Sequence, residues 1–185
     1  MICRENPSRR WLSLKKTLVG LLCAGLALGQ STRPNRQVSE QEVKAAYLLN
    51  FVKFVEWDPT RDGGEAPFTI CIAGTDPFGS ALDRLVEGER IENRRIVIER
   101  VRRWQNPCRV FFIGSSELDA AQLLAGVGSG VLTVGEESRF LRDGGMIALV
   151  VEDRKVRFDI NLKAARRASV RMSSRLLDVA RQVER

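Results

Sequence analysis

The segment from Glu40 to Trp57, EQEVKAAYLLNFVKFVEW, most constrains the fold of this chain, because it has helical periodicity and very little polar surface. On a helical wheel one broad side is apolar, and it consists of Val43, Tyr47, Leu48, Phe51, Val52, Phe54 and Val55. A narrow polar stripe opposite consists of Glu42, Lys53 and Glu56. Such a helix must be covered over most of its surface, either by its own domain or by a partner.

Two residues of this helix are candidates for function. Leu49 falls within the polar stripe, so we expect an exposed leucine at the edge of a dimer or partner surface, although single exposed leucines are common. Asn50 falls near the edge of the apolar side. Ser39, with Glu42 three residues later, predicts a capping box at the start of the helix. Asp58 precedes a proline, which predicts that the helix ends near Trp57.

The composition excludes several classes of function. The length of 185 residues suits one domain, and a hydrophobic content of 44% can supply its core. Five of the basic residues and one acidic residue lie in residues 1–29, so only +3 of the net charge of +7 belongs to the rest. This small remaining charge and the lack of an aromatic-rich basic face argue against a nucleic-acid partner. The chain has no histidine, which removes Ser-His and Cys-His catalytic pairs and histidine metal ligands. We therefore predict neither an enzyme nor a cofactor.

Residues 1–29 predict a signal peptide that exports the protein to the periplasm. Basic residues precede the apolar run of residues 17–28, and Ala27 and Gly29 favour cleavage after Gly29. This run is shorter than the roughly 20 residues of a membrane span, although an uncleaved anchor is the alternative. The adjacent Arg9 and Arg10 leave both Sec and twin-arginine export open. We expect a flexible leader over residues 30–38 and a single domain over residues 39–185.

Strand-like and helix-like segments alternate along that domain. We expect strands over residues 67–73, 94–100, 109–113 and 131–134, and a hairpin formed by residues 146–151 and 156–160. Helices are expected to begin at Pro77 after a cap by Asp76, at Glu117 after a cap by Ser115 and Ser116, after Asn161, and after a cap by Ser173 or Ser174, with a helical turn over residues 136–142. This order predicts an α/β fold, a three-layer sandwich in which helices flank a mixed β-sheet, with a C-terminal hairpin followed by helices.

Two cysteines remain after signal cleavage, and an oxidising compartment would allow them to pair. Cys71 lies in one predicted strand and Cys108 opens another. A disulfide is feasible if these strands are neighbours, and two buried thiols are the alternative. The chain has no CxxC motif, which argues against a thioredoxin-like redox role.

Polar residues at the strand ends suggest a ligand cleft. Asp76 and Asn161 each follow a predicted strand, and together with Asn50 they could line a small-molecule site. Asp76 is also explained as an ordinary helix cap. The adjacent Glu136 and Glu137 point in different directions on a helical turn, which indicates a solvated surface rather than a pair of catalytic acids.

The segment after the predicted hairpin carries a second candidate surface. Lys163, Arg166 and Arg167 lie on the helix that Asn161 caps, and they form the densest basic run of the predicted domain. They are candidates for contact with a partner, and a solvated helix face is the alternative.

Three motifs, in this order and spacing, resemble the YfiR-type family of small exported bacterial proteins. They are VKAAYLLNFVKFVEW, PFTICIAGTDPFG and GGMIALVVEDRKVRFDINLKAARRASVRMSSRLLDVAR. The resemblance covers residues 40–182, and the opening helix and the DINLKAARRASVRMSSRLL segment contribute most to it.

The resemblance implies a periplasmic regulator. In such systems the protein binds the periplasmic sensor domain of an inner-membrane signalling protein, a diguanylate cyclase or in other cases a histidine kinase. Repression of the cyclase controls cyclic di-GMP and biofilm formation. The resemblance also implies a homodimer and a disulfide that Cys71 and Cys108 match. A second cysteine pair of the founding protein, near the hairpin, is absent here, since Met146 to Ile160 contains no cysteine. An exported small-molecule-binding component of a sensor system is the alternative function.

Overall fold

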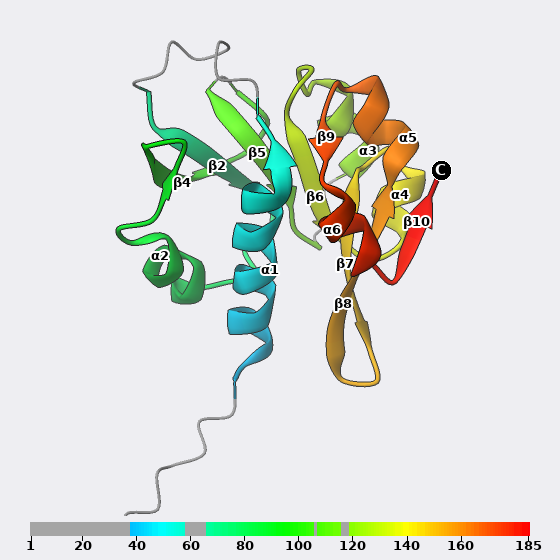
Figure 1. Cartoon of the computed structure of the whole chain (residues 1–185), viewed down its shortest axis with the longest axis horizontal. Helices are drawn as coiled ribbons and strands as arrows, with labels where there is room; N and C mark the ends of the chain where they lie inside the picture. The colour runs from blue at the N-terminus through cyan, green and yellow to red at the C-terminus, as the bar shows by residue number, and fades with distance from the viewer. Residues whose placement is uncertain (1–37, 58–65, 106, 116–118) are drawn as a thin grey trace, which may run out of the picture. The chain divides into compact units, whose positions relative to one another are not determined.

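A mixed β-sheet forms the centre of the fold in the computed structural model, which describes residues 38–57, 66–105, 107–115 and 119–185. In this part of the chain the sheet has eight strands, in the order β10-β8-β7-β6-β5-β2-β4-β3 (Figure 1). Their bounds are β2 (Phe68–Ala73), β3 (Arg90–Ile91), β4 (Arg94–Val101), β5 (Cys108–Ile113), β6 (Leu132–Glu136), β7 (Ile147–Glu152), β8 (Lys155–Asn161) and β10 (Gln182–Glu184). Strands β4, β2, β5, β6 and β7 are parallel, whereas β8 is antiparallel to β7 and β3 to β4. Strand β10 pairs in parallel with β8.

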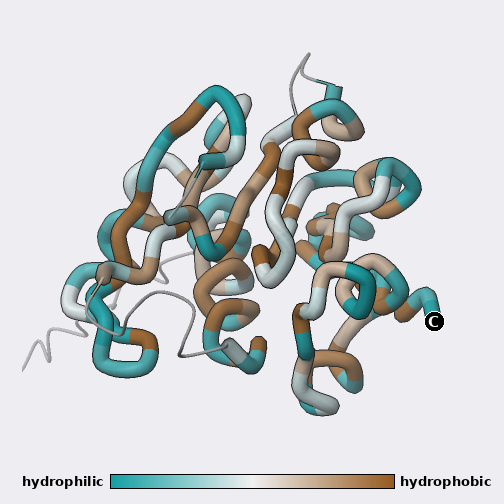
Figure 2. Tube along the Cα trace, turned by 90° about the horizontal axis from the view of Figure 1, so that it is seen from above, coloured by the Kyte–Doolittle hydropathy of each residue, from teal (hydrophilic) through white to brown (hydrophobic). Residues whose placement is uncertain are grey.

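Helices cover both faces of this sheet, which confirms the predicted α/β sandwich with a mixed sheet. The larger core lies beneath α1 (Glu40–Phe54), α2 (Ser80–Val86), α5 (Leu162–Arg167) and α6 (Ser174–Asp178). The smaller core on the other face includes residues of α4 (Arg139–Arg142), and partly buried residues of α3 (Ala120–Ala125) pack against it. Hydrophobic stretches gather inside the domain and hydrophilic ones at its turns (Figure 2).

Strands β2 and β5 are buried along their whole length because both of their faces are covered. Phe68, Ile70 and Ile72 face the larger core, whereas Cys71 faces the smaller one. The two strands are neighbours, and Cys71 forms a disulfide with Cys108 across them, with 5.7 Å between the Cα atoms. The predicted pairing of these cysteines is therefore confirmed.

Helix α1 begins as the sequence predicts and ends earlier. Ser39 and Glu42 form the complete capping box. The helix ends at Phe54, because Val55–Glu56 form strand β1, which pairs antiparallel with β9 (Arg171–Met172) in a separate two-stranded sheet. The predicted end near Trp57 is therefore three residues too late. The paired residues lie more than a hundred positions apart in the chain, so the sequence near Trp57 contains no pattern that predicts this pairing.

Leu49 is buried, with 7% of its surface exposed, so the prediction that it lies on an exposed polar stripe is wrong. The helical wheel assumes that a helix has one covered side. Helix α1 instead contacts α2, α6 and β8 (Figure 1), and Leu49 belongs to the larger core. The next residue, Asn50, is exposed.

Two other helices begin later than predicted. Helix α2 starts at Ser80, after Gly79 with φ +51°, and not at Pro77. Helix α3 starts at Ala120 with Asp119 as its cap, whereas Ser115 lies at the end of β5 and residue 116 is outside the described part. The predicted hairpin is β7–β8, whose turn residues Asp153 and Arg154 both have positive φ, as a type I′ turn requires. The caps by Asn161 and Ser173 are confirmed, whereas strand β10 was not predicted.

The predicted signal peptide and nearly all of the predicted leader lie outside the described residues. Residues 37–185 form one compact unit. In the described part of the chain, no helix is both long and apolar enough to cross a membrane.

Because Leu49 is buried, truncating it should destabilise the domain. We expect Leu49→Ala to lower the free energy of unfolding by about 2–4 kcal/mol, from lost burial and an incompletely filled cavity. Urea unfolding followed by circular dichroism measures this change. Asn50→Ala is the matched control at an exposed position and should change the stability by less than about 0.5 kcal/mol. Equal effects of the two substitutions would contradict the burial of Leu49.

The disulfide closes a loop with a sequence separation of 37 residues. Loop-closure entropy then predicts that the double variant Cys71→Ala and Cys108→Ala is less stable by about 3–4 kcal/mol. Urea unfolding of the oxidised protein, the reduced protein and the variant measures this difference. The reduced protein and the variant should have similar unfolding midpoints, both lower than that of the oxidised protein. A variant as stable as the oxidised protein would show that the disulfide contributes no net stability.

Candidate functional site

A partly buried ion pair joins helix α1 to the carboxyl ends of the parallel strands. The Lys44 Nζ lies 2.7 Å from the Glu136 Oε1 and 2.7 Å from the Glu40 Oε1. The Glu136 side chain is only 9% exposed and that of Lys44 12%. The backbone N–H of Ser115, at the end of β5, donates to the Glu136 Oε2 at 2.9 Å. Glu136 therefore connects α1, β5 and β6.

Burial and hydrogen bonding have opposite effects on the pKa values of this pair. Burial disfavours charge on Glu136, but hydrogen bonds from Lys44 and Ser115 outweigh it and hold the pKa of the carboxyl below its ordinary value of 4.5. Burial likewise disfavours charge on Lys44, and hydrogen bonds to Glu136 and Glu40 outweigh it, so that the pKa of the amine is above its ordinary value of 10.5. Both groups are therefore charged at neutral pH.

Two hollows open beside this ion pair. One has a volume of about 520 Å³, and its lining includes Lys44, Glu136 and Arg181. The other has a volume of about 460 Å³ and includes Asp119, Glu136 and Asp143. They lie where β5 and β6 end, which is the usual place for a ligand in an open α/β sheet. Their charged lining suits a polar ligand. Ser115 lines both hollows, and its side chain and its backbone N–H both hydrogen-bond to Glu136.

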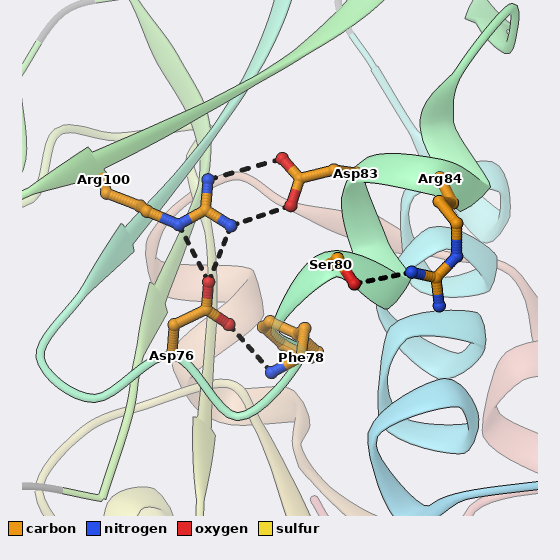
Figure 3. Close-up of polar contacts among 6 residues, drawn as sticks. All are labelled: Asp76, Phe78, Ser80, Asp83, Arg84 and Arg100. Atoms are coloured by element: carbon orange, nitrogen blue, oxygen red, sulfur yellow. Dashed lines mark hydrogen bonds and ion pairs between the residues drawn. The ribbon is translucent and has the colours of Figure 1, made fainter.

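Asp76 takes part in a structural cluster and does not line these hollows. Arg100 lies between Asp76 and Asp83, with its Nη2 2.8 Å from the Asp76 Oδ2 and 2.9 Å from the Asp83 Oδ2 (Figure 3). The other oxygen of Asp76 accepts from the backbone N–H of Phe78 at 2.8 Å. The hydrogen bonds from Arg100 lower the pKa of Asp83. The cluster joins the ends of β2 and β4 to α2.

The predicted cleft of Asn50, Asp76 and Asn161 is not formed. Asp76 follows the carboxyl end of β2, whereas Asn161 ends β8, which is antiparallel to β7 and so ends at the opposite edge of the sheet. Asn161 is buried, donates to the carbonyl of Leu141 and accepts from the N–H of Ala164. Asn50 is exposed on α1 and lines neither hollow.

The three basic residues of α5 form one exposed face, which we call the α5 basic face. Lys163, Arg166 and Arg167 are exposed, whereas Leu162, Ala164 and Ala165 are buried. The spacing i, i+3, i+4 brings the three cations to the same side of the helix. No carboxylate in the described part of the chain forms an ion pair with any of them.

Sequence reasoning missed the pairing of Lys44 with Glu136. The prediction that Glu136 and Glu137 form a solvated surface is wrong for Glu136, which is the last residue of β6, and holds for Glu137, which is exposed. A glutamate that directly follows a buried apolar run was the available signal. Its partner on α1 is 92 positions away in the chain and could not be identified from local spacing.

Comparison with known proteins identifies the family. A profile of the YfiR/HmsC-like family matches residues 41–181, which includes almost all of the described domain. The chain belongs to the YfiR/HmsC-like family. At the level of the family, its members are periplasmic regulators of diguanylate cyclase signalling and are not catalytic.

A solved structure shares the fold at low sequence identity. A conserved domain protein from Vibrio cholerae aligns with a TM-score of 0.50 and 8% identity, over 79% of this chain and 60% of that one. The ABC domain from Streptococcus pneumoniae in complex with L-Trp has a TM-score of 0.43 and 11% identity, over 63% of this chain and 55% of that one. The curated proteins gave no match.

The ion pair of Lys44 and Glu136 predicts a dependence of stability on pH. Glu136→Gln removes the charge but keeps the shape, and we expect it to lower the free energy of unfolding at pH 7 by about 2 kcal/mol. Since the pKa of Glu136 is lower in the folded than in the unfolded state, its contribution is present above about pH 4.5 and is lost as the pH falls through the folded pKa.

The measurement is urea unfolding between pH 3 and pH 8. The stability difference between the wild type and Glu136→Gln should shrink as the solution becomes more acidic. Glu137→Gln changes the exposed neighbour and should follow the wild type throughout. A stability difference that is the same at every pH would show that the charge of Glu136 is not what stabilises α1 on the sheet.

Proposed function

We propose that the protein is a periplasmic repressor that binds the sensor domain of an inner-membrane diguanylate cyclase and thereby controls cyclic di-GMP and biofilm formation. The observation that carries this proposal is the family match over residues 41–181. The disulfide of Cys71 and Cys108 supports export, because such bonds persist in oxidising compartments. Export would use the signal peptide of residues 1–29, with cleavage after Gly29.

Repression requires that the protein bind the inactive conformation of the cyclase more tightly than the active one. A hundredfold preference would shift a two-state equilibrium by about 2.7 kcal/mol. The contact surface that we propose is the α5 basic face, Lys163, Arg166 and Arg167, whose exposed and unpaired cations would complement carboxylates on the sensor domain. Leu49 is no longer a candidate for this contact, because it is buried. A homodimer would present two such faces, and a histidine kinase is the other kind of sensor partner that fits.

A second candidate function is the recognition of a small polar molecule within the same signalling system. The hollow of about 520 Å³ beside Lys44 and Glu136 supports it, because its charged lining lies at the carboxyl ends of parallel strands. Native mass spectrometry of protein taken directly from the periplasm would detect such a ligand. Residues Asn50, Asp76 and Asn161 would not form that site.

Deleting the gene should raise cellular cyclic di-GMP, which mass spectrometry of cell extracts measures. The wild-type gene should restore the low level, and a variant with Lys163, Arg166 and Arg167 changed to glutamine should restore it only in part. The matched control changes Arg95, Arg102 and Arg103, three exposed cations on and just after β4, to glutamine and should repress fully. An unchanged level of cyclic di-GMP after deletion, in a strain that expresses the cyclase, would overturn the proposed function.

A further inference from the structure

The β7–β8 hairpin projects beyond the rest of the sheet. Strands β7 and β8 pair along their whole length, to Glu152 and Lys155 at the turn. Strand β6 accompanies β7 only as far as Leu149, and β10 accompanies β8 only from Asp159 onwards. Residues 150–157 therefore form a two-stranded ribbon that extends past the sheet (Figure 1). Such a ribbon reaches an approaching surface before the body of the domain does.

The ribbon exposes an apolar side chain. Val151 is 53% exposed and lies opposite Val156 in the strand register. Val156 lines a hollow of about 360 Å³ together with Val38 and Val43 at the start of α1. Val38 is itself 63% exposed. Two of the most exposed large apolar side chains of the described part therefore lie at the same end of the domain.

Basic side chains surround these valines. Arg154, Lys155 and Arg157 are exposed, and none forms an ion pair with a carboxylate of the described part of the chain. The nearby Glu152 is held by Arg181, with 2.9 Å between its Oε1 and the Nη1. Asp153 is the remaining acid of the ribbon, so that the ribbon has a net positive charge.

We propose that this hairpin end, which consists of Val38, Val151, Arg154, Lys155 and Arg157, docks on anionic phospholipid headgroups at a membrane surface. Exposed apolar side chains flanked by Lys and Arg are the composition of interfacial membrane-binding elements, in which the apolar groups enter the headgroup boundary and the cations bind lipid phosphates. The α5 basic face has three unpaired cations as well, but none of the exposed large apolar residues of the described part lies on α5. Of these two basic surfaces in the described part of the chain, the hairpin end is the one that combines both properties.

This proposal does not rest on the proposed function, because lipid binding requires no cyclase. If both hold, docking concentrates the regulator at the membrane in which its partner is embedded, and it raises the effective concentration without a new protein contact. The hairpin end would then face the lipid and leave the α5 basic face, at the other end of β8, for the sensor domain.

The test is co-sedimentation of protein, purified from the periplasm after expression of the full chain, with two kinds of vesicle. One contains phosphatidylglycerol and phosphatidylethanolamine in a ratio of about 1:3, and the other contains phosphatidylcholine alone. We expect binding to the anionic vesicles and release by 1 M NaCl, which shortens the screening length from about 10 Å at 0.1 M to about 3 Å. Failure to sediment with the anionic vesicles would overturn the proposal.

Variants locate the contact. Each neutralised cation should weaken partitioning about fivefold, so changing Arg154, Lys155 and Arg157 together to glutamine should weaken it about a hundredfold. Val151→Asp should weaken it about fivefold or more, at an exposed position where the fold is not at risk. The matched control, Lys163, Arg166 and Arg167 changed to glutamine, removes the same charge from α5 and should change partitioning less than twofold. Equal losses from the two triple variants would overturn the proposal in favour of unspecific electrostatic adsorption, and a loss from the α5 variant alone would overturn it in favour of the other face.

Discussion

The packing of helix α1 across the sheet is the contact on which the rest of this structure depends. Its aromatic side chains meet Phe158 of β8, with ring centroids 5.4 Å away for Tyr47 and 4.9 Å away for Phe51. The ion pair of Lys44 with Glu136 fixes the first half of the helix at the carboxyl ends of the strands. The pairing of β1 with β9 fixes the segment that follows the C-terminal end of α1. An apolar helix is thus covered within its own domain, which leaves the hairpin end and the α5 basic face free for contacts.

Much of the fold could be predicted from the sequence because its signals are local. The capping residues Ser39, Asn161 and Ser173 act on amides three positions ahead, and short apolar runs produced the buried strands β2 and β5. The alternation of these strands with helices was sufficient to predict the layered architecture. The disulfide of Cys71 with Cys108 followed from a resemblance, and from strand segments that proved to be neighbours.

The candidate site could not be predicted in the same way, because its geometry depends on distant parts of the chain. Leu49 is covered by other elements of the fold, which a helical wheel does not represent, and Glu136 pairs with a lysine 92 positions away. Asp76 follows β2 and Asn161 ends β8, but the reversal of β8 places them at opposite ends of the strands. Local spacing identified the α5 basic face correctly as exposed, since three cations at i, i+3 and i+4 alternate with buried positions.

We propose that this member of the YfiR/HmsC-like family represses a membrane cyclase by binding it directly. The most direct test is to titrate the purified protein into proteoliposomes in which the sensor domain of the cyclase faces the added protein, and to measure the conversion of GTP to cyclic di-GMP. We expect a saturable loss of cyclase activity that is complete at a fixed molar ratio of the protein to the cyclase. Cyclase activity that stays constant while the protein is shown to be folded and in excess would contradict it.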